Sequence, residues 1–399
     1  MLKNLITFFC FVFCFNLFAQ TPTIIFEEYT LPNGLKVILH ENHTTPIVAV
    51  SVMYHVGSKN EKPNRTGFAH FFEHLLFEGS KHIKRGEFFK YIENAGGQNN
   101  ANTTNDRTFY YEVLPSNQLE LGLWLESERL LHANINQDGV DTQNEVVKEE
   151  KRLRVDNQPY GSFFAEINKR AFKEHPYKWT TIGEMEHLDA ATLDEFIDFY
   201  HKFYVPENAI LSIAGDIDVA YTKQLISSYF GTIPRGKGDI EKVSIVEPPL
   251  GGEIRDTIYD DIQLPGVMMA YRAPKQGDED FYAIEMMSKI LSDGESSRLN
   301  KTCVEKSQSA MYCGSFPYAS EDPGLSFVYS IANSGVDPLD LELEINKELK
   351  LLQTTLVSEK EMRKIRNMIE NDFLGNFTSM IGIAENLANY KMYFGDANL

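Results

Sequence analysis

His70, Glu73 and His74 lie within about one helical turn of one another in the sequence. On a helix, positions i, i+3 and i+4 share one face, so these side chains would project together. Two neutral imidazoles can supply Zn–N bonds, and a carboxylate that stays off the metal can accept a proton from a metal-bound water. The spacing therefore predicts a metal centre with a general base beside it.

The alternative without a metal is that these histidines are hydrogen-bonded core residues. The surrounding stretch, residues 68–77, is rich in phenylalanine and leucine, which predicts a mostly buried helix. Burying two imidazoles and a carboxylate on one face is costly unless something binds them, so we prefer the metal hypothesis. The pattern is H-x-x-E-H, the inverted form of the H-E-x-x-H zinc-protease signature.

A catalytic zinc usually has three protein ligands and a water, so a third ligand is expected on another helix. Segment 143–153 is acidic and favours a helix. Its apolar stripe is taken as Val146, Val147 and Leu153. Helical spacing then places Gln143 and Glu150 on the inward side, and Glu149 about 100° away. We choose Glu150 as the ligand and Glu149 as its solvated neighbour.

With the motif at 70–74 and Glu150 beyond it, the chain resembles the pitrilysin/insulinase family of zinc metallopeptidases. The compact bacterial, mitochondrial-processing-peptidase-like members are the most similar. Four further segments fall in the family's order and spacing, namely LPNGLKV at 31–37, VGS at 56–58, GGQNNA at 96–101 and YVPEN at 204–208. The resemblance runs from Thr30 to the end of the chain.

The resemblance implies one zinc ion per chain, bound by His70, His74 and Glu150, with Glu73 as general base in peptide-bond hydrolysis. It also implies that the strand near 99–103 is an edge to which an extended substrate adds as one more strand. Peptides and unfolded segments are therefore the expected substrates. The expected substrate contacts are Asn100, Ala101 and Phe77.

Two features depart from the family's pattern. Many relatives carry a glutamate where this chain has Gln143, which can hydrogen-bond near the metal but brings no charge. Relatives that work alone hold substrate with an arginine and a tyrosine, spaced R-x6-Y, after a Ser-Ser-Arg-Leu run like that at 296–299. Here the aligned positions are Val304 and Met311, and Tyr312 lies one place off. If the pair is missing, a zinc-free homologous subunit would supply the contacts; a homodimer is the other expected assembly.

A different class of function is a non-catalytic structural or peptide-binding subunit of a hetero-oligomer. Loss of motif residues would be its signature, and here the motif is intact. A purely structural zinc is a weaker hypothesis, because such sites usually use four cysteine-rich ligands and leave no general base beside them.

Composition and the N-terminal sequence limit the classes of partner and the cellular compartment that we expect. The chain has 399 residues, 43% of them hydrophobic, enough for two domains, and its net charge of −19 disfavours nucleic-acid binding. Residues 1–20 combine an early lysine with an apolar run at 5–18, which indicates a signal peptide cleaved after Ala19. We expect export to the periplasm and no stable membrane insertion after cleavage. An uncleaved N-terminal anchor is the alternative.

The remaining cysteines and histidines carry less information. Beyond residue 20 the cysteines are Cys303 and Cys313, which either pair in an oxidising compartment or remain buried thiols. All ten histidines lie at or before His201, which confines imidazole metal chemistry to the first half. Eight of them show no ligand spacing and are interpreted as ordinary residues, namely His40, His43, His55, His82, His132, His175, His187 and His201.

The order of elements predicts an α+β fold of two structurally similar domains, each an antiparallel-rich sheet with helices packed on it. Strands are expected at 24–31, 35–41, 47–56, 98–103, 108–114, 209–214, 254–260 and 266–271. The zinc-binding domain would span 21–232, a Pro/Gly-rich linker 233–252, and an inactive homologous domain 253–399. The family usually continues past the position of Leu399, which suggests a longer natural product.

Overall fold

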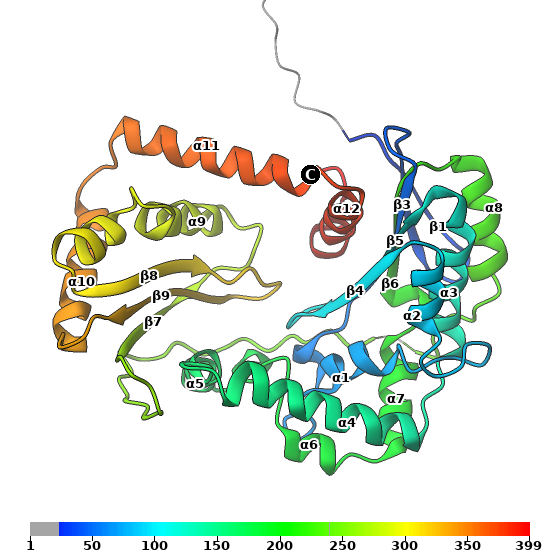
Figure 1. Cartoon of the computed structure of the whole chain (residues 1–399), viewed down its shortest axis with the longest axis horizontal. Coiled ribbons are helices and arrows are strands. Elements are labelled where there is room, and N and C mark those ends of the chain that lie inside the picture. Colours follow the sequence, from blue (N-terminus) through cyan, green and yellow to red (C-terminus); the bar gives the residue numbers. More distant parts are fainter. Residues whose placement is uncertain (1–23, 239) are drawn as a thin grey trace, which may run out of the picture.

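The computed structural model describes residues 24–238 and 240–399, so the expected signal peptide lies outside the described residues. Among the helices in these two ranges, none combines the length and the apolar character that crossing a membrane requires. Figure 1 shows two α/β halves side by side, one built on a six-stranded sheet and the other on a three-stranded sheet. The predicted α+β class and two-domain architecture are confirmed.

The first sheet has the strand order β1-β2-β6-β3-β5-β4, with β2 and β6 parallel and the other pairs antiparallel. Its strands are β1 Glu27–Thr30, β2 Lys36–Glu41, β3 Ile47–Tyr54, β4 Gln98–Thr103, β5 Thr108–Pro115 and β6 Ala209–Gly215. The central strands β3 and β6 are almost entirely buried, which explains their continuous apolar sequences. Strand β4 is polar and pairs only with β5, so it is an edge strand.

Helices cover both faces of this sheet. Those of the first half are α1 Phe68–Leu75, α2 Phe88–Asn94, α3 Leu119–His132, α4 Gln137–Lys151, α5 Phe163–Ala171, α6 Met185–Asp189, α7 Leu193–Phe203 and α8 Val219–Phe230. Side chains of α1, α3, α7 and α8 form the main core with one face of the sheet. The other face is covered from the far end of the chain by α12, Met380–Phe394, through Ala384, Leu387 and Ala388.

The second sheet has the order β7-β9-β8, which repeats the antiparallel arrangement β3-β5-β4 of the first. Its elements are β7 Gly266–Ala273, α9 Glu279–Ser292, β8 Ala310–Pro317, β9 Gly324–Ala332, α10 Pro338–Thr354 and α11 Glu359–Asn376. The strand predicted at 254–260 is wrong. That segment has irregular backbone, and Tyr259 is 92% exposed, so its apolar side chains face solvent instead of a sheet. Cys303 and Cys313 are buried free thiols.

The two halves exchange helices. While α12 of the second half packs on the first sheet, α5 and the residues after it pack on the second sheet. Phe172 contributes to a small apolar core with Leu325 and Phe327 of β9. Neither sheet therefore has both of its faces covered by helices from its own half alone.

A buried polar network joins the halves at the turn between β8 and β9. The Lys59 ammonium lies 2.9 Å from an Asp106 carboxylate oxygen and 2.5 Å from a Glu321 carboxylate oxygen. The Glu321 backbone N–H donates to Asp106, and the Tyr177 hydroxyl donates to the same carboxylate at 2.7 Å. The Asp322 N–H donates to the Tyr177 hydroxyl. We call these five residues the interdomain network.

Acid is expected to weaken the interdomain network. Burial would raise the pKa of Glu321, but the hydrogen bond from His55 and the charges of His55 and Lys59 lower it to about 2. A carboxyl whose folded pKa lies below its ordinary value of 4.5 stabilises the fold above that value. This contribution is lost as the pH falls from 4.5 towards 2. Trp179 donates to the Ser58 carbonyl inside this region, so its fluorescence should report the transition.

The matched variant is Glu321→Gln, which keeps the shape of the side chain but cannot titrate. Asp322 also pairs with Lys59 and with His175 in this network. A smaller acid response will therefore remain in the Glu321→Gln variant. An identical acid transition in the wild type and in Glu321→Gln would contradict the assignment.

Candidate metal centre and active site

The motif helix α1 starts at a glycine for a steric reason. Gly67 adopts a left-handed conformation with φ of 93°, and a Cβ there would lie 2.7 Å from the Ile182 carbonyl oxygen. The buried Glu61 carboxylate accepts hydrogen bonds from the N–H groups of Gly67 and Ala69, each at 2.8 Å. These bonds satisfy free N–H groups at the helix start and fix its position. Sequence analysis missed Glu61, because nothing in the sequence near it signals a cap.

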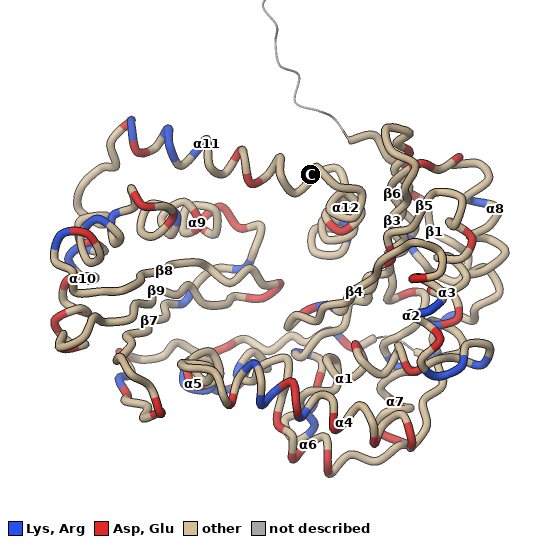
Figure 2. The backbone as a smooth tube through the Cα atoms, viewed as in Figure 1, with Lys and Arg blue, Asp and Glu red and all other residues tan. Residues whose placement is uncertain are grey.

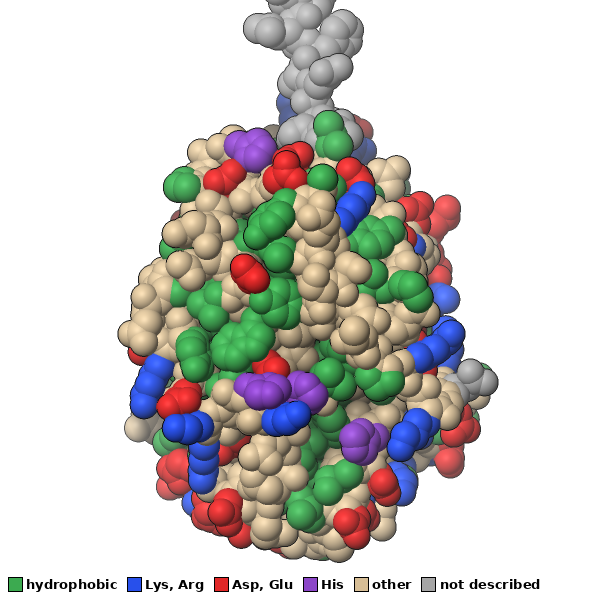
Figure 3. Space-filling model, turned by 90° about the vertical axis from the view of Figure 1, so that its right-hand side faces the viewer, with side chains coloured by type: hydrophobic (Ala, Val, Ile, Leu, Met, Phe, Trp, Pro, Cys, Tyr) green, Lys and Arg blue, Asp and Glu red, His purple; other side chains and the backbone are tan. Residues whose placement is uncertain are grey.

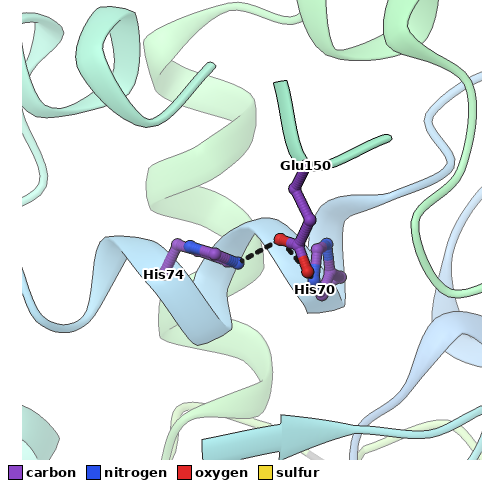
Figure 4. Close-up of side chains that lie close together, drawn as sticks. All are labelled: His70, His74 and Glu150. Atoms are coloured by element: carbon purple, nitrogen blue, oxygen red, sulfur yellow. Dashed lines mark ion pairs between the residues drawn. The ribbon is translucent and has the colours of Figure 1, made fainter. Parts of the chain in front are cut away.

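The structure brings together the three predicted ligands (Figure 4). The Nε2 atoms of His70 and His74, both on α1, lie 3.5 and 3.0 Å from the same carboxylate oxygen of Glu150 on α4. His70 is buried, and the side chains of His74 and Glu150 are 24% and 15% exposed. The site is thus largely shielded but reachable by solvent from one side.

Glu73 lies beside these residues and remains outside the ligand cluster. Its carboxylate accepts a hydrogen bond of 2.6 Å from the Thr103 hydroxyl, at the end of edge strand β4. This contact fixes the orientation of the carboxylate and ties the motif helix to the edge strand. Thr103 is a second residue that sequence analysis missed.

The protonation states suit metal binding. Burial and the neighbouring His74 lower the pKa of His70 to about 4, so its imidazole is neutral. The hydrogen bond from His74 lowers the pKa of Glu150, which keeps that carboxylate ionised. Burial raises the pKa of Glu73, and the hydrogen bond from Thr103 opposes this only in part. A neutral imidazole and an ionised carboxylate are the forms that ligate metals.

The residues present fit a zinc ion. Tetrahedral zinc with Zn–N and Zn–O bonds of about 2.0–2.2 Å places neighbouring donor atoms roughly 3.3–3.5 Å apart. The Glu150 oxygen that faces both imidazoles is buried and lies 3.0 and 3.5 Å from their Nε2 atoms, close to the spacing of donor atoms that share one zinc ion. Two nitrogens, one carboxylate oxygen and an open side match the donor set of catalytic zinc.

Glu150 is on the inward face of α4, as predicted, but the apolar stripe used to place it was partly wrong. Val147 is buried, whereas Val146 is 42% and Leu153 56% exposed. The expected neighbour Glu149 is exposed and pairs with Arg152. Directly after Glu150 the helix widens into a π-helical turn, Arg152–Asp156, a feature often found at functional sites.

Two further contacts surround Glu150 and its helix. Arg154, on the π-helical turn, lies 2.8 Å from the Glu150 oxygen that points away from the imidazoles. Gln143, predicted to lie near the metal, donates instead to the Glu78 carboxylate at 2.5 Å. It therefore links α4 to the chain that follows the motif helix, and its amide makes no hydrogen bond to His70, His74 or Glu150 in the described structure.

The three predicted substrate contacts lie around the edge strand. Asn100 is exposed on β4 and pairs in register with Tyr111, while the next residue, Ala101, is half-buried against the core. Phe77 follows the motif helix and packs against Phe89 with ring centroids 5.0 Å apart. Asn100 and Ala101 are therefore part of the edge strand itself, and Phe77 belongs to the segment that follows the motif helix.

The positions that depart from the R-x6-Y spacing differ in environment. Val304 is half-buried in the second core, whereas Met311 and Tyr312 are 54% and 51% exposed on β8. A β-bulge separates Ala310 from Tyr312, so Met311 is the extra residue of the strand. The bulge gives Tyr312 the register that Met311 would have in a regular strand.

Two of the eight other histidines, which we interpreted as ordinary residues, lie close together in space. His82 and His132 lie with Glu128 in a second cluster whose potential ligand atoms are all within 4.8 Å of one another. The long separation of residue 82 from residue 132 hid this arrangement. The signal available in the sequence was Glu128 and His132 at i and i+4 on one helix.

Charged residues are interspersed over the whole chain, with acidic and basic side chains in both halves (Figure 2). Acidic residues exceed basic ones by 57 to 38. This distribution favours neutral or cationic partners over polyanions.

Comparisons with known proteins identify the family of this chain. Residues 36–184 match the family model described as insulinase (peptidase family M16), and residues 190–369 match the peptidase M16 inactive domain. The chain is 30% identical to the zinc protease PqqE of Helicobacter pylori, over 94% of this chain and 85% of that protein. It is 25% identical to the mitochondrial-processing peptidase subunit beta of Blastocladiella emersonii, over 92% of this chain and 79% of that protein.

Solved structures show the same likeness. A crystal structure of a protease from Helicobacter pylori has a TM-score of 0.89 and 30% identity, covering 93% of this chain and 90% of that chain. The periplasmic protease PqqL of Escherichia coli has the same fold, with a TM-score of 0.75 at 20% identity over 92% of this chain and 42% of that chain. This chain therefore belongs to the insulinase (M16) family of peptidases.

Proposed function

We propose that this protein is a zinc-dependent endopeptidase that hydrolyses peptide bonds in peptides or unfolded segments. The observation that carries the proposal is the convergence of His70, His74 and Glu150 next to a carboxylate, Glu73, that is outside the ligand cluster. A structural zinc site would need no such free carboxylate. The family's zinc proteases support the same activity.

His70, His74 and Glu150 would hold the zinc ion. When bound, zinc supplies Lewis-acid chemistry at the reacting carbonyl and lowers the pKa of water. Glu73 accepts the proton of the attacking water and passes it to the leaving amine. Thr103 keeps the Glu73 carboxylate oriented by its hydrogen bond during both transfers.

Strand β4 would bind the substrate. Its outer edge has backbone N–H and C=O groups without a strand partner in the described residues, and an extended peptide can pair with them. Because Thr103 of this strand contacts Glu73, a peptide paired with β4 would lie next to the general base. A folded globular substrate would have to open before it could bind in this way.

A partner subunit is a further part of the proposal. Val304 and Met311 replace residues that hold substrate in relatives that act alone, and one relative is named as a subunit. The bulge at Met311 favours Tyr312 as a substitute for the tyrosine of the R-x6-Y pair, but Val304 offers no positive charge in place of the arginine.

The alternative function is a non-catalytic structural or peptide-binding subunit of a hetero-oligomer. The match of residues 190–369 to an inactive domain, together with the absence of histidine after His201, supports a non-catalytic role for the second half.

Export to the periplasm is proposed from residues 1–20 alone, with an uncleaved anchor as the alternative. N-terminal sequencing of the protein recovered from a periplasmic extract tests it. A mature chain beginning near Gln20 is the expected result, and a chain that remains cytoplasmic with Met1 in place would contradict export.

Hydrolysis of a quenched-fluorescent peptide library by the purified mature chain tests the proposed function. We expect cleavage that a chelator abolishes and added zinc restores. Cleavage by the chain alone would make it self-sufficient. Cleavage only after mixing with a zinc-free homologue from the same genome would place the missing substrate contacts on a partner. No cleavage in either assay would contradict the proposed activity and favour the non-catalytic subunit.

A further inference from the structure

A second group of metal-ligating side chains lies outside the active site. His82, Glu128 and His132 each offer one ligand atom, and these atoms lie within 4.8 Å of one another. We call these three residues the outer histidine cluster. None of them belongs to the His70, His74 and Glu150 cluster. Figure 3 shows the face on which α2, α3 and α8 lie, and there histidine side chains are adjacent at the surface.

Secondary structure fixes two of the three side chains relative to each other. Glu128 and His132 are four residues apart in the last turns of α3, so they share one face of that helix. A helix that presents a carboxylate and an imidazole in this way holds both ligands with little loss of entropy on binding.

The third side chain is held by backbone pairing. The Lys81 N–H donates to the His132 carbonyl at 2.9 Å, and the Asn134 N–H donates to the Gly79 carbonyl at 3.1 Å. The segment 79–83 is thereby paired with the end of α3 at Gly79 and at Lys81, the residue directly before His82. The two imidazole rings have centroids 5.3 Å apart and are nearly perpendicular.

The Glu128 carboxylate is held in a fixed orientation by hydrogen bonds. Glu128 is 6% exposed, and its two oxygens accept hydrogen bonds from His82 Nδ1 at 2.8 Å and from the Ser80 hydroxyl at 2.5 Å. The Ser80 oxygen accepts the backbone N–H groups of His82 and Ile83, which fixes the hydroxyl. Burial would raise the pKa of Glu128, but the bonds from Ser80 and His82 outweigh it and lower the pKa. A carboxylate oriented by a hydroxyl in this way resembles the supported ligands of metal sites.

The ordinary alternative is a surface ion pair between His82 and Glu128. Such a pair explains one imidazole but leaves the second without a role, since no hydrogen bond to a His132 ring nitrogen occurs in the described part of the chain. His82 is half exposed, so an ion and its water ligands could reach the cluster from solvent. Two imidazoles and one carboxylate, with solvent in the fourth position, form a donor set suited to zinc and similar divalent ions.

We propose that His82, Glu128 and His132 form a second divalent-metal site that takes Zn²⁺. Zinc there would hold segment 79–83 against α3. Because this segment follows directly from the motif helix and Phe77, the ion would stiffen the chain that leaves the active site. The role is that of a clamp, and it requires no chemistry of the bound ion.

Metal stoichiometry tests the site without any activity assay. The metal-free mature chain is titrated with Zn²⁺ against a chromophoric chelator. We expect two equivalents for the wild type and one for His82→Ala and for His132→Ala. The matched control is His201→Ala, which removes an exposed histidine from α7 and should leave two equivalents. The double variant His70→Ala, His74→Ala should keep one equivalent, which His82→Ala then removes.

A variant that keeps all three ligands separates loss of the metal site from misfolding. Ser80→Ala keeps all three ligands but removes the hydroxyl that orients Glu128, so the second zinc should bind about 10–100-fold more weakly while the first is unchanged. One equivalent in the wild type would overturn the proposal. Two equivalents in folded His82→Ala would also overturn it, because the second ion would then lie elsewhere on the acidic surface.

Discussion

A Glu73→Gln variant is expected to keep its metal and to lose about 10²–10⁴-fold in kcat, the range typical of a removed general base. Glutamine preserves the shape of the side chain and can still accept the Thr103 hydroxyl, so the fold should not change. It cannot accept a proton from water. The measurement is kcat on a fluorogenic peptide, together with the zinc content of the same sample.

The matched control for this variant is Glu149→Gln, because Glu149 is exposed on α4 and makes only a surface pair with Arg152. It should retain full turnover. Full activity in Glu73→Gln would remove Glu73 from the proposed role. Loss of zinc together with activity would mean that Glu73 acts as a ligand instead of a base.

A Glu150→Gln variant is expected to lose the metal itself. An amide oxygen is a weaker ligand than a carboxylate, and the change leaves the buried His70 imidazole and the partly buried His74 imidazole without a charged partner. Mutation of a residue that only supports a ligand typically lowers metal affinity about 10–100-fold. We expect the loss of zinc affinity in Glu150→Gln to be larger than this. Turnover should fall in parallel and recover in part at high zinc concentration. The measurement is a zinc titration followed by an assay at each concentration.

This experiment separates two adjacent glutamates. If Glu149→Gln loses zinc and Glu150→Gln does not, the assignment of the inward face of α4 is wrong. If neither variant changes zinc binding, the third ligand lies elsewhere. The structure makes a clear choice, because Glu150 is 3.0 Å from His74 whereas Glu149 points to solvent.

Local patterns carried most of the prediction of fold and site. The i, i+3, i+4 spacing on α1 placed His70, Glu73 and His74 on one face, whereas the family resemblance supplied the edge strand at β4. The selection of Glu150 was correct in geometry although Val146 and Leu153 proved exposed. Spacing relative to Val147 alone was sufficient, because a helix has few positions that face the same neighbour.

What sequence analysis missed depends on contacts between distant segments. Glu61 caps the motif helix, and His82 meets Glu128, only because loops return to the same place in the fold. The segment 254–260 contains the β-favouring residues Ile254, Ile258 and Tyr259 but has no strand partner in the described part of the chain, so its Tyr259 faces solvent. Pairing partners and loop returns leave no periodic signal in the chain.

The packing of α12 on the first sheet has a consequence for synthesis. The strands of that sheet are complete at Gly215, but the helix that covers their second face begins at Met380. At about 5–20 residues per second, the roughly 165 residues between these points take on the order of ten seconds or more to make. During that interval an apolar surface that includes Ile38, Ala49 and Ile210 stays uncovered on the growing chain. The growing chain therefore exposes an aggregation-prone apolar surface until α12 has been made.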